Sequence, residues 1–150
     1  AFSAVLNDIA GRKTGDAGKR LETIAAASND TMGAAARLTR SALAIQDGDR
    51  KTAIAQYRLV SDDSGVPEAY RQAALIRLTQ LEYDTLKPDE VIARMQPLAV
   101  KDNAWFGTAG ELTALAMLKG NRRSEAAQLL KTISAEKTVP APIRARAGEL

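Results

Sequence analysis

The chain has 150 residues, of which 45% are hydrophobic but only 4% aromatic, and this length suffices for one domain that buries its own core without disulfides or metals. It contains no His and no Cys, which excludes the Ser-His-Asp triad, Cys and His nucleophiles and the usual zinc and haem ligands. Its net charge of +3 comes from 21 basic and 18 acidic residues mixed along the chain, so we expect no nucleic-acid binding.

The first third of the chain carries three expected helices, because its apolar residues recur with helical spacing. Residues 11–15 break the first pattern, and Asp16 is expected to cap the second helix. Residues 29–31 (Asn-Asp-Thr) are a further stop-and-cap signal before a third helix that is rich in Ala and Leu. The expected apolar stripes are Phe2, Val5, Leu6 and Ile9, followed by Ala17, Leu21 and Ile24.

Residues 47–49 (Asp-Gly-Asp) predict a tight turn in which Gly48 ends one helix and Asp49 caps the next. Pro67 is expected at the start of the helix after that. Residues 88–90 give another start signal, and Pro97 must bend or end the helix that they open. The stripes in this part are Ala53, Tyr57 and Val60, then Tyr70, Ala74, Leu78 and Leu81, and then Val91, Met95 and Leu98.

The last third of the chain again predicts helices joined by short turns. A helix is expected over 105–119, a turn at 120–121, and then the stripe Ala126, Leu129, Leu130 and Ile133. Pro140 and Pro142 open a final helix. The pattern therefore predicts an all-α fold of about nine helices, arranged as roughly four hairpins plus a terminal helix within a single domain, 1–150.

The expected turns recur at a regular interval. Gly15 and Gly48 are 33 residues apart, and Gly120 follows 72 residues later, which is two steps of 36. Two helices per unit of about 34 residues are typical of tetratricopeptide repeats (TPR), so we predict a TPR-like α-solenoid. Ala53 and Tyr57 lie where the motif has a small and then an aromatic residue. The other units fit less well: the last needs a turn one residue longer, and the first has Arg20 where Ala is expected.

Several segments resemble TPR-like proteins of the YfgM type. Residues 103–105, 109–112 and 115–121 are similar to the last full unit of that family, 91–99 resembles the helix before it, and 70–84 resembles the helix before that. The likeness covers most of the chain, best from about Gly48 onward.

The YfgM-type resemblance implies a bacterial inner-membrane protein with one N-terminal transmembrane helix and a periplasmic repeat domain. Family members associate with the Sec translocon and with a membrane-anchored periplasmic chaperone of the prolyl-isomerase type. We therefore expect this chain to be the periplasmic part of such a protein, a fragment without its membrane anchor. A TPR adaptor in outer-membrane assembly or in the cytosol is the alternative.

Protein binding is the expected function, on the concave face that the first helices of the hairpins line. The candidate residues on helices 30–46, 68–83 and 104–119 are Arg37, Leu38, Arg71, Leu75, Trp105 and Phe106. Each also has a structural interpretation: the leucines as core residues, the arginines as solvated side chains, and Trp105 packed under the turn at 97–98. Adjacent helical positions point about 100° apart, so Trp105 and Phe106 can hardly be buried in the same way, and we expect one of them to face a partner. Aromatic residues are favoured at binding hot spots.

The sequence predicts no enzyme, no cofactor and no metal site. The adjacent acids at 62–63 and 89–90 are accounted for by a loop and a helix start, and 47–49 lacks the further acids of a calcium loop. Weak self-association through exposed solenoid ends is a further expectation.

Overall fold

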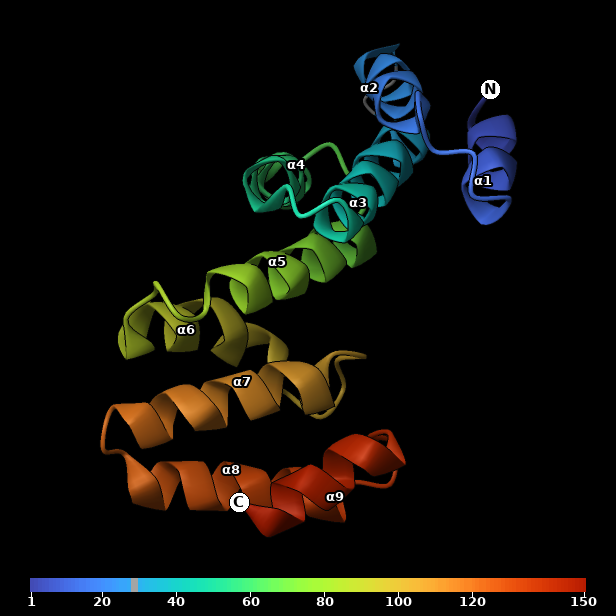
Figure 1. The fold of residues 1–150 in the computed structure, drawn as a ribbon. Coiled ribbons are helices and arrows are strands. Elements are labelled where there is room, and N and C mark those ends of the chain that lie inside the picture. The colour runs from blue at the N-terminus through green and yellow to red at the C-terminus, as the bar shows by residue number, and fades with distance from the viewer. Residues whose placement is uncertain (28–29) are drawn as a thin grey trace. The chain divides into compact units, whose positions relative to one another are not determined.

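The structure is a computed structural model that describes residues 1–27 and 30–150. In that part of the chain all the regular secondary structure is helical, as predicted (Figure 1). The expected cap at Asn29 lies outside the described residues. The elements are α1 (Phe2–Ala10), α2 (Ala17–Ala27), α3 (Thr31–Gln46), α4 (Arg50–Asp62), α5 (Glu68–Glu82), α6 (Pro88–Met95), the 3-10 helix η1 (Gln96–Leu98), α7 (Phe106–Lys119), α8 (Arg123–Ala135) and α9 (Ala141–Glu149).

The helices fold into two compact units, Ala1–Leu81 and Glu82–Leu150. Consecutive helices pack on one another within each unit, which is the arrangement of a helical-hairpin repeat. The single-domain organisation over 1–150 stays a prediction.

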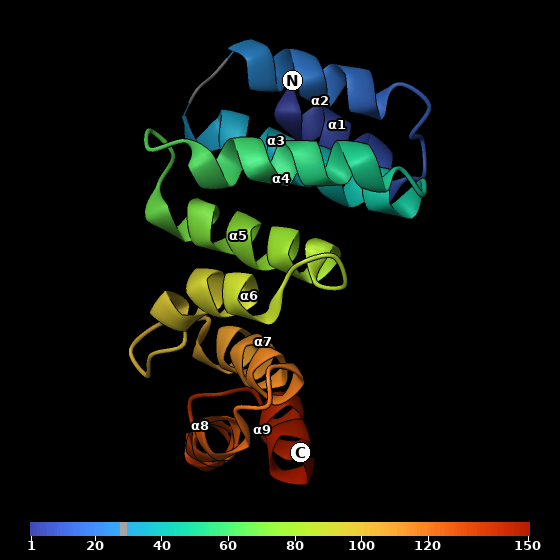
Figure 2. The same ribbon diagram turned by 90° about the vertical axis from the view of Figure 1, so that its left-hand side faces the viewer.

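In the first unit, α3 lies between α2 and α4 (Figure 2). One side of α3 contributes Ala36 and Leu43 to a core shared with α1 and α2. Another side contributes Ala34 to a core that contains Tyr57 of α4 and Leu78 of α5. The central helix is therefore buried on two sides, and small residues there let its neighbours approach closely.

In the second unit, α7 packs against α6, η1, α8 and α9. Two glycines make this close packing possible. A Cβ atom added at Gly107 would lie 2.7 Å from Val139 Cγ1, and one added at Gly110 would lie 2.7 Å from Ile133 Cδ1. Both distances are shorter than a van der Waals contact, so these positions require glycine unless the neighbouring side chain moves.

Three of the inter-helix turns share one geometry. Arg12, Gly48 and Asn121 are the residues with positive φ in the described chain, at 61°, 75° and 61°. After α3, the Gly48 N–H donates to the Ile45 carbonyl and the Asp49 N–H to the Ala44 carbonyl, which is the Schellman motif. The same pair of hydrogen bonds follows α1 and α7.

These turns correct the predicted register of the repeat. The first left-handed residue is Arg12 rather than Gly15, and the last is Asn121 rather than Gly120. Five residues after Arg12, Gly48 and Asn121 comes a fully buried alanine, and nine residues after each comes a large buried residue. The alanines are Ala17, Ala53 and Ala126, and the large residues are Leu21, Tyr57 and Leu130. The misfit at Arg20 therefore disappears, because Ala17 occupies the small position.

The helix α6 follows the same spacing with a different start. Val91 and Met95 are buried four residues apart, as in the other second helices, and Leu98 follows three residues later in η1. Here Pro88 occupies the first turn, and the Glu90 carboxylate accepts a 2.7 Å hydrogen bond from the backbone N–H of Lys87. Pro97 ends the α-helix as predicted, because the chain continues from Met95 as a 3-10 turn.

Acidic residues cap two of the helices. The Asp49 carboxylate accepts from the Thr52 backbone N–H at 3.1 Å, and Asp30 accepts from Met32 N–H at 3.0 Å. Hydrogen bonds from Thr52 hold the pKa of Asp49 below its ordinary value.

One predicted core position is wrong: the Leu6 side chain is 40% exposed, because α1 turns only Val5 fully inward.

Gly107→Val should lower the free energy of unfolding by about 1–3 kcal/mol, because the added methyl groups overlap Val139 and Ile143. Gly18 is the matched control: it is likewise the second residue of its helix, and a Cβ atom added there would have no neighbouring atom within 4 Å. Gly18→Val should change stability by less than about 0.5 kcal/mol. Urea denaturation of both variants measures the difference, and equal losses would contradict the close α7 contact.

Arg12→Gly should raise the free energy of unfolding by about 1 kcal/mol, since a left-handed conformation is strained for a residue with a Cβ. Gly48→Ala should lower it by about the same amount for the same reason, although no atom crowds the new methyl group. Thermal denaturation followed by circular dichroism checks both, and effects of the same sign would refute the shared turn geometry.

Candidate protein-binding surfaces

The two candidate arginines are held by backbone carbonyls. Arg37, half-buried on α3, places its Nη2 3.5 Å from the Ala25 carbonyl in the last turn of α2. The Nε of Arg71, on α5, donates to the Val66 carbonyl at 3.0 Å. Both side chains therefore link neighbouring segments of the first unit, a role that the sequence did not reveal.

The two candidate leucines are half-buried. Leu38 packs against the core formed by α3, α4 and α5, and Leu75 lies on α5 with part of its side chain exposed. Each can contribute an apolar edge to a surface, but neither projects freely into solvent.

Trp105 and Phe106 have different surroundings, as their adjacent positions require. Phe106 is only 3% exposed and belongs to the core of the second unit, so it presents almost no surface to a partner. Trp105 is half-buried at the N-cap of α7, where its backbone N–H donates to Asn103 Oδ1 at 2.8 Å. Of the two aromatic residues, only Trp105 is accessible for binding.

A depression of about 300 Å³ in the second unit is lined by Ala104 and Phe106, the two sequence neighbours of Trp105. It lies between the loop before α7 and the loop before α9. Its lining residues include Lys101, Asn103, Phe106, Gly107, Thr138 and Val139. Gly107 and Val139, which pack closely on each other, are buried residues of this lining.

A second depression in the same unit, of about 390 Å³, lies over α7 between η1 and α8. Thr113 and Met117 form its buried floor, and Gln96 and Gln128 lie on opposite sides. No sequence pattern marks this surface, because neutral residues such as Gln96 and Gln128 carry no signal of a site.

The first unit contains a larger depression, of about 590 Å³, on the outer side of α4. Its lining residues are Arg37, Ala55, Arg58, Leu59, Asp62 and Asp63. Only Arg37 of this set was predicted. Leu59 is 51% exposed, and the signal that could have found it is its place opposite the buried stripe of Ala53, Tyr57 and Val60.

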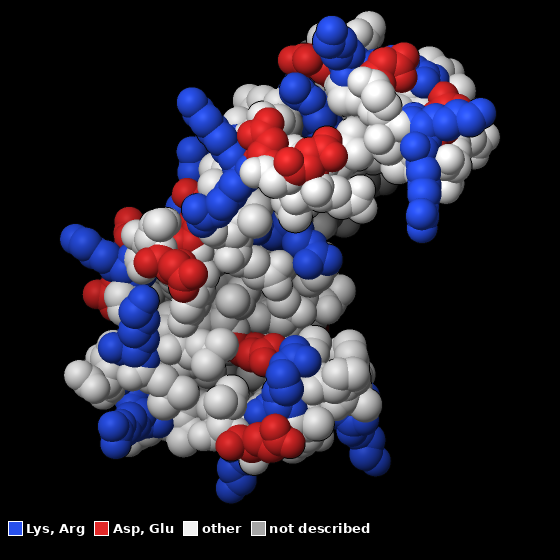
Figure 3. Space-filling view, viewed as in Figure 1, with Lys and Arg blue, Asp and Glu red and all other residues white. Residues whose placement is uncertain are grey.

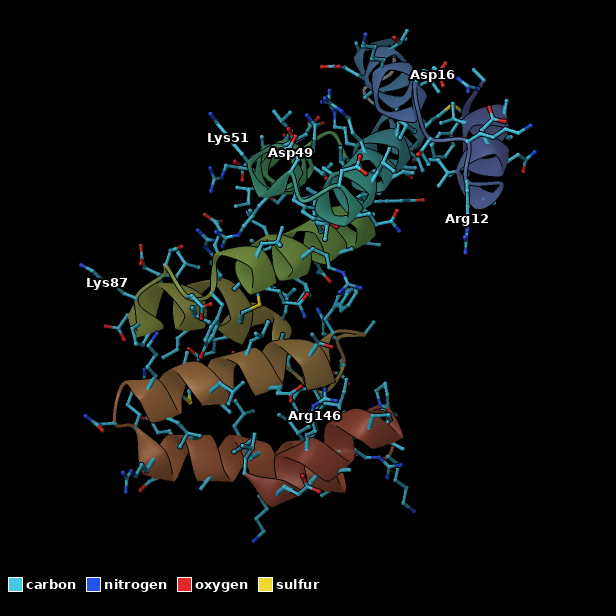
Figure 4. All side chains as sticks on the ribbon, viewed as in Figure 1. Arg12, Asp16, Asp49, Lys51, Lys87 and Arg146 are labelled. Carbon is cyan, nitrogen blue, oxygen red and sulfur yellow. The ribbon has the colours of Figure 1, made fainter. Side chains whose placement is uncertain are left out.

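Charged residues of both signs are interspersed over each unit on the face shown in Figure 3. Several of them join helices. Arg146 of α9 forms a two-pronged ion pair with Glu111 of α7, with Nε–Oε1 and Nη2–Oε2 distances of 2.7 and 2.9 Å (Figure 4). Arg94 of α6 lies 3.1 Å from Glu82, and Arg20 of α2 lies 2.6 Å from Asp8 of α1. These charges stabilise the hairpin stack.

The described residues contain no group of three or more His, Cys, Asp or Glu side chains that could hold a metal ion. Burial raises the pKa of the Tyr57 hydroxyl, which lies in the core of the first unit. Among the described helices, none combines the length and the apolar character that crossing a membrane requires.

No family model, curated protein or solved structure matches this chain.

Phe106→Ala should lower the free energy of unfolding by about 3–5 kcal/mol, because it removes a large side chain from a packed core. Trp105→Ala should cost less, about 2 kcal/mol, since part of that side chain is exposed in the folded chain. Chemical denaturation of the two variants measures both values. A larger loss for Trp105→Ala would mean that Trp105 acts mainly as a core residue.

Proposed function

We propose that this chain is a non-enzymatic scaffold that binds other proteins. The observation that carries the proposal is the partly exposed Trp105 at the start of α7, whose sequence neighbours Ala104 and Phe106 line a depression of about 300 Å³. Helical-hairpin stacks bind partner segments on their exposed helix faces, and tryptophan is enriched among the residues that dominate binding energy.

We propose further that the hairpins are repeats of the tetratricopeptide type. The register of small and large residues after Arg12, Gly48 and Asn121 supports this assignment. The residues flanking Trp105 are also among those that resemble the YfgM-type family. On that resemblance we propose a location on the periplasmic face of the bacterial inner membrane, with the Sec translocon and a periplasmic chaperone as partners.

The test is affinity capture of the full-length protein from detergent-solubilised membranes of its source cell, followed by mass spectrometry. Trp105→Ala should lower the recovery of translocon subunits and of the chaperone several-fold while the melting temperature stays close to that of the unchanged protein. Leu6→Ala is the matched control, because it removes another accessible apolar side chain, on α1 in the first unit. It should leave the recovery unchanged.

Two results would decide against parts of this proposal. Recovery of the full-length protein in the soluble cytosolic fraction, without these partners, would discard the location and the partners. Equal loss of partners in Trp105→Ala and Leu6→Ala would discard the surface at α7.

A further inference from the structure

The outer face of α4 carries apolar residues that do not pack into the core of the chain. Ala53, Tyr57 and Val60 point into the core, whereas Ala55 and Leu59 lie on the exposed side and line the depression of about 590 Å³. A small and a large apolar residue one helical turn apart provide a hole and a knob on the same surface.

The two ends of this face carry opposite charges. Lys51 is exposed in the first turn of α4 and points away from the fold beside Asp49 (Figure 4). Asp62 and Asp63 are exposed at the other end of the helix and border the depression. A face of about three helical turns is therefore basic at one end and acidic at the other, and its middle holds the apolar Ala55 and Leu59 with the exposed Arg58 beside them.

This charge order opposes the dipole of α4. Apart from the capping carboxylate of Asp49, the start of the helix has no acid in its first turn, and its last turn contains no base, although an acid at the start and a base at the end stabilise a helix. An antiparallel neighbour with the same charge order would offset this unfavourable interaction with the dipole. Its acidic end would lie beside the N-terminus of α4, and its basic end would lie beside the C-terminus.

A second copy of α4 has the properties of such a neighbour. In an antiparallel pair centred at the level of Tyr57, Leu59 of each copy lies opposite Ala55 of the other. In the same register, Lys51 of each copy lies opposite the 62–63 end of the other. Both the apolar and the ionic contacts then occur twice, as a two-fold interface requires.

We propose that the outer face of α4 is a self-association surface, and that it forms a weak two-fold dimer through antiparallel pairing of α4 with a second copy of this chain. The proposal does not depend on the function assigned to Trp105, which lies in the other unit. A contact formed mainly by one helix falls at the small end of the range of protein interfaces, so the dimer dissociates readily.

Sedimentation equilibrium of the 150-residue chain between about 10 µM and about 1 mM tests the proposal, since weak dimers exchange in this range. The unchanged chain should show a monomer–dimer equilibrium. Leu59→Asp should be monomeric throughout, because the charge would be buried against Ala55. This substitution is on the exposed side of α4 and should leave the circular dichroism spectrum and the melting temperature nearly unchanged.

Charge reversal distinguishes this register from other modes of association. Lys51→Glu and Asp62→Lys should each weaken the dimer about tenfold, because every dimer contains the altered contact twice. The combined variant should recover the original affinity. Both reversals agree with the dipole of α4, so neither should unfold the monomer. Lys131→Glu, the same change of charge at an exposed position of α8, should have no effect.

A monomer at every concentration would overturn the proposal. So would a dimer that Leu59→Asp leaves intact, or one in which the combined charge variant stays as weak as the single variants.

Discussion

The close approach of neighbouring helices, made possible by alanine and glycine at their contacts, is the constraint on which this structure depends. Ala17, Ala53 and Ala126 are fully buried at the same position of three second helices, and Gly107 and Gly110 leave no room for a Cβ atom on α7. Since small residues contribute little apolar area themselves, the larger residue four positions after each alanine provides most of the buried surface. The hairpins are held together by this repeated pairing of a small and a large side chain.

The turns set the register of that pairing. Each Schellman motif places one left-handed residue at a constant distance before the buried alanine, so the turn and the core contact form a single unit of sequence. Only one of the three left-handed residues is a glycine. Arginine and asparagine occupy the other two positions, and the two hydrogen bonds of the motif are formed at each of them. Glycine therefore does not mark the left-handed residue of the first and last turns, which are Arg12 and Asn121.

The surfaces that are open to partners follow from the same architecture. Packing directs one side of each helix inward and leaves the other exposed, so Phe106 fills the core of its unit while the adjacent Trp105 stays accessible. On α4 the same division leaves Ala55 and Leu59 outside, opposite Ala53 and Tyr57. Ion pairs such as Arg146 with Glu111 connect helices that are distant in sequence. The charged residues therefore have structural roles beside any role in recognition.

Local sequence patterns were sufficient to predict the all-helical fold, the hairpin order and most core positions, because helical spacing of apolar residues and strong caps such as Asp49 act over short distances along the chain. They also predicted that one of Trp105 and Phe106 would be more buried than the other, since neighbouring positions of a helix point in different directions. Which of the two is buried became known only from the packing of the helices. The same holds for the contacts of Arg37 and Arg71 with backbone carbonyls and for the exposure of Leu6. Each of these depends on where a neighbouring segment lies, and spacing along one helix carries no information about that.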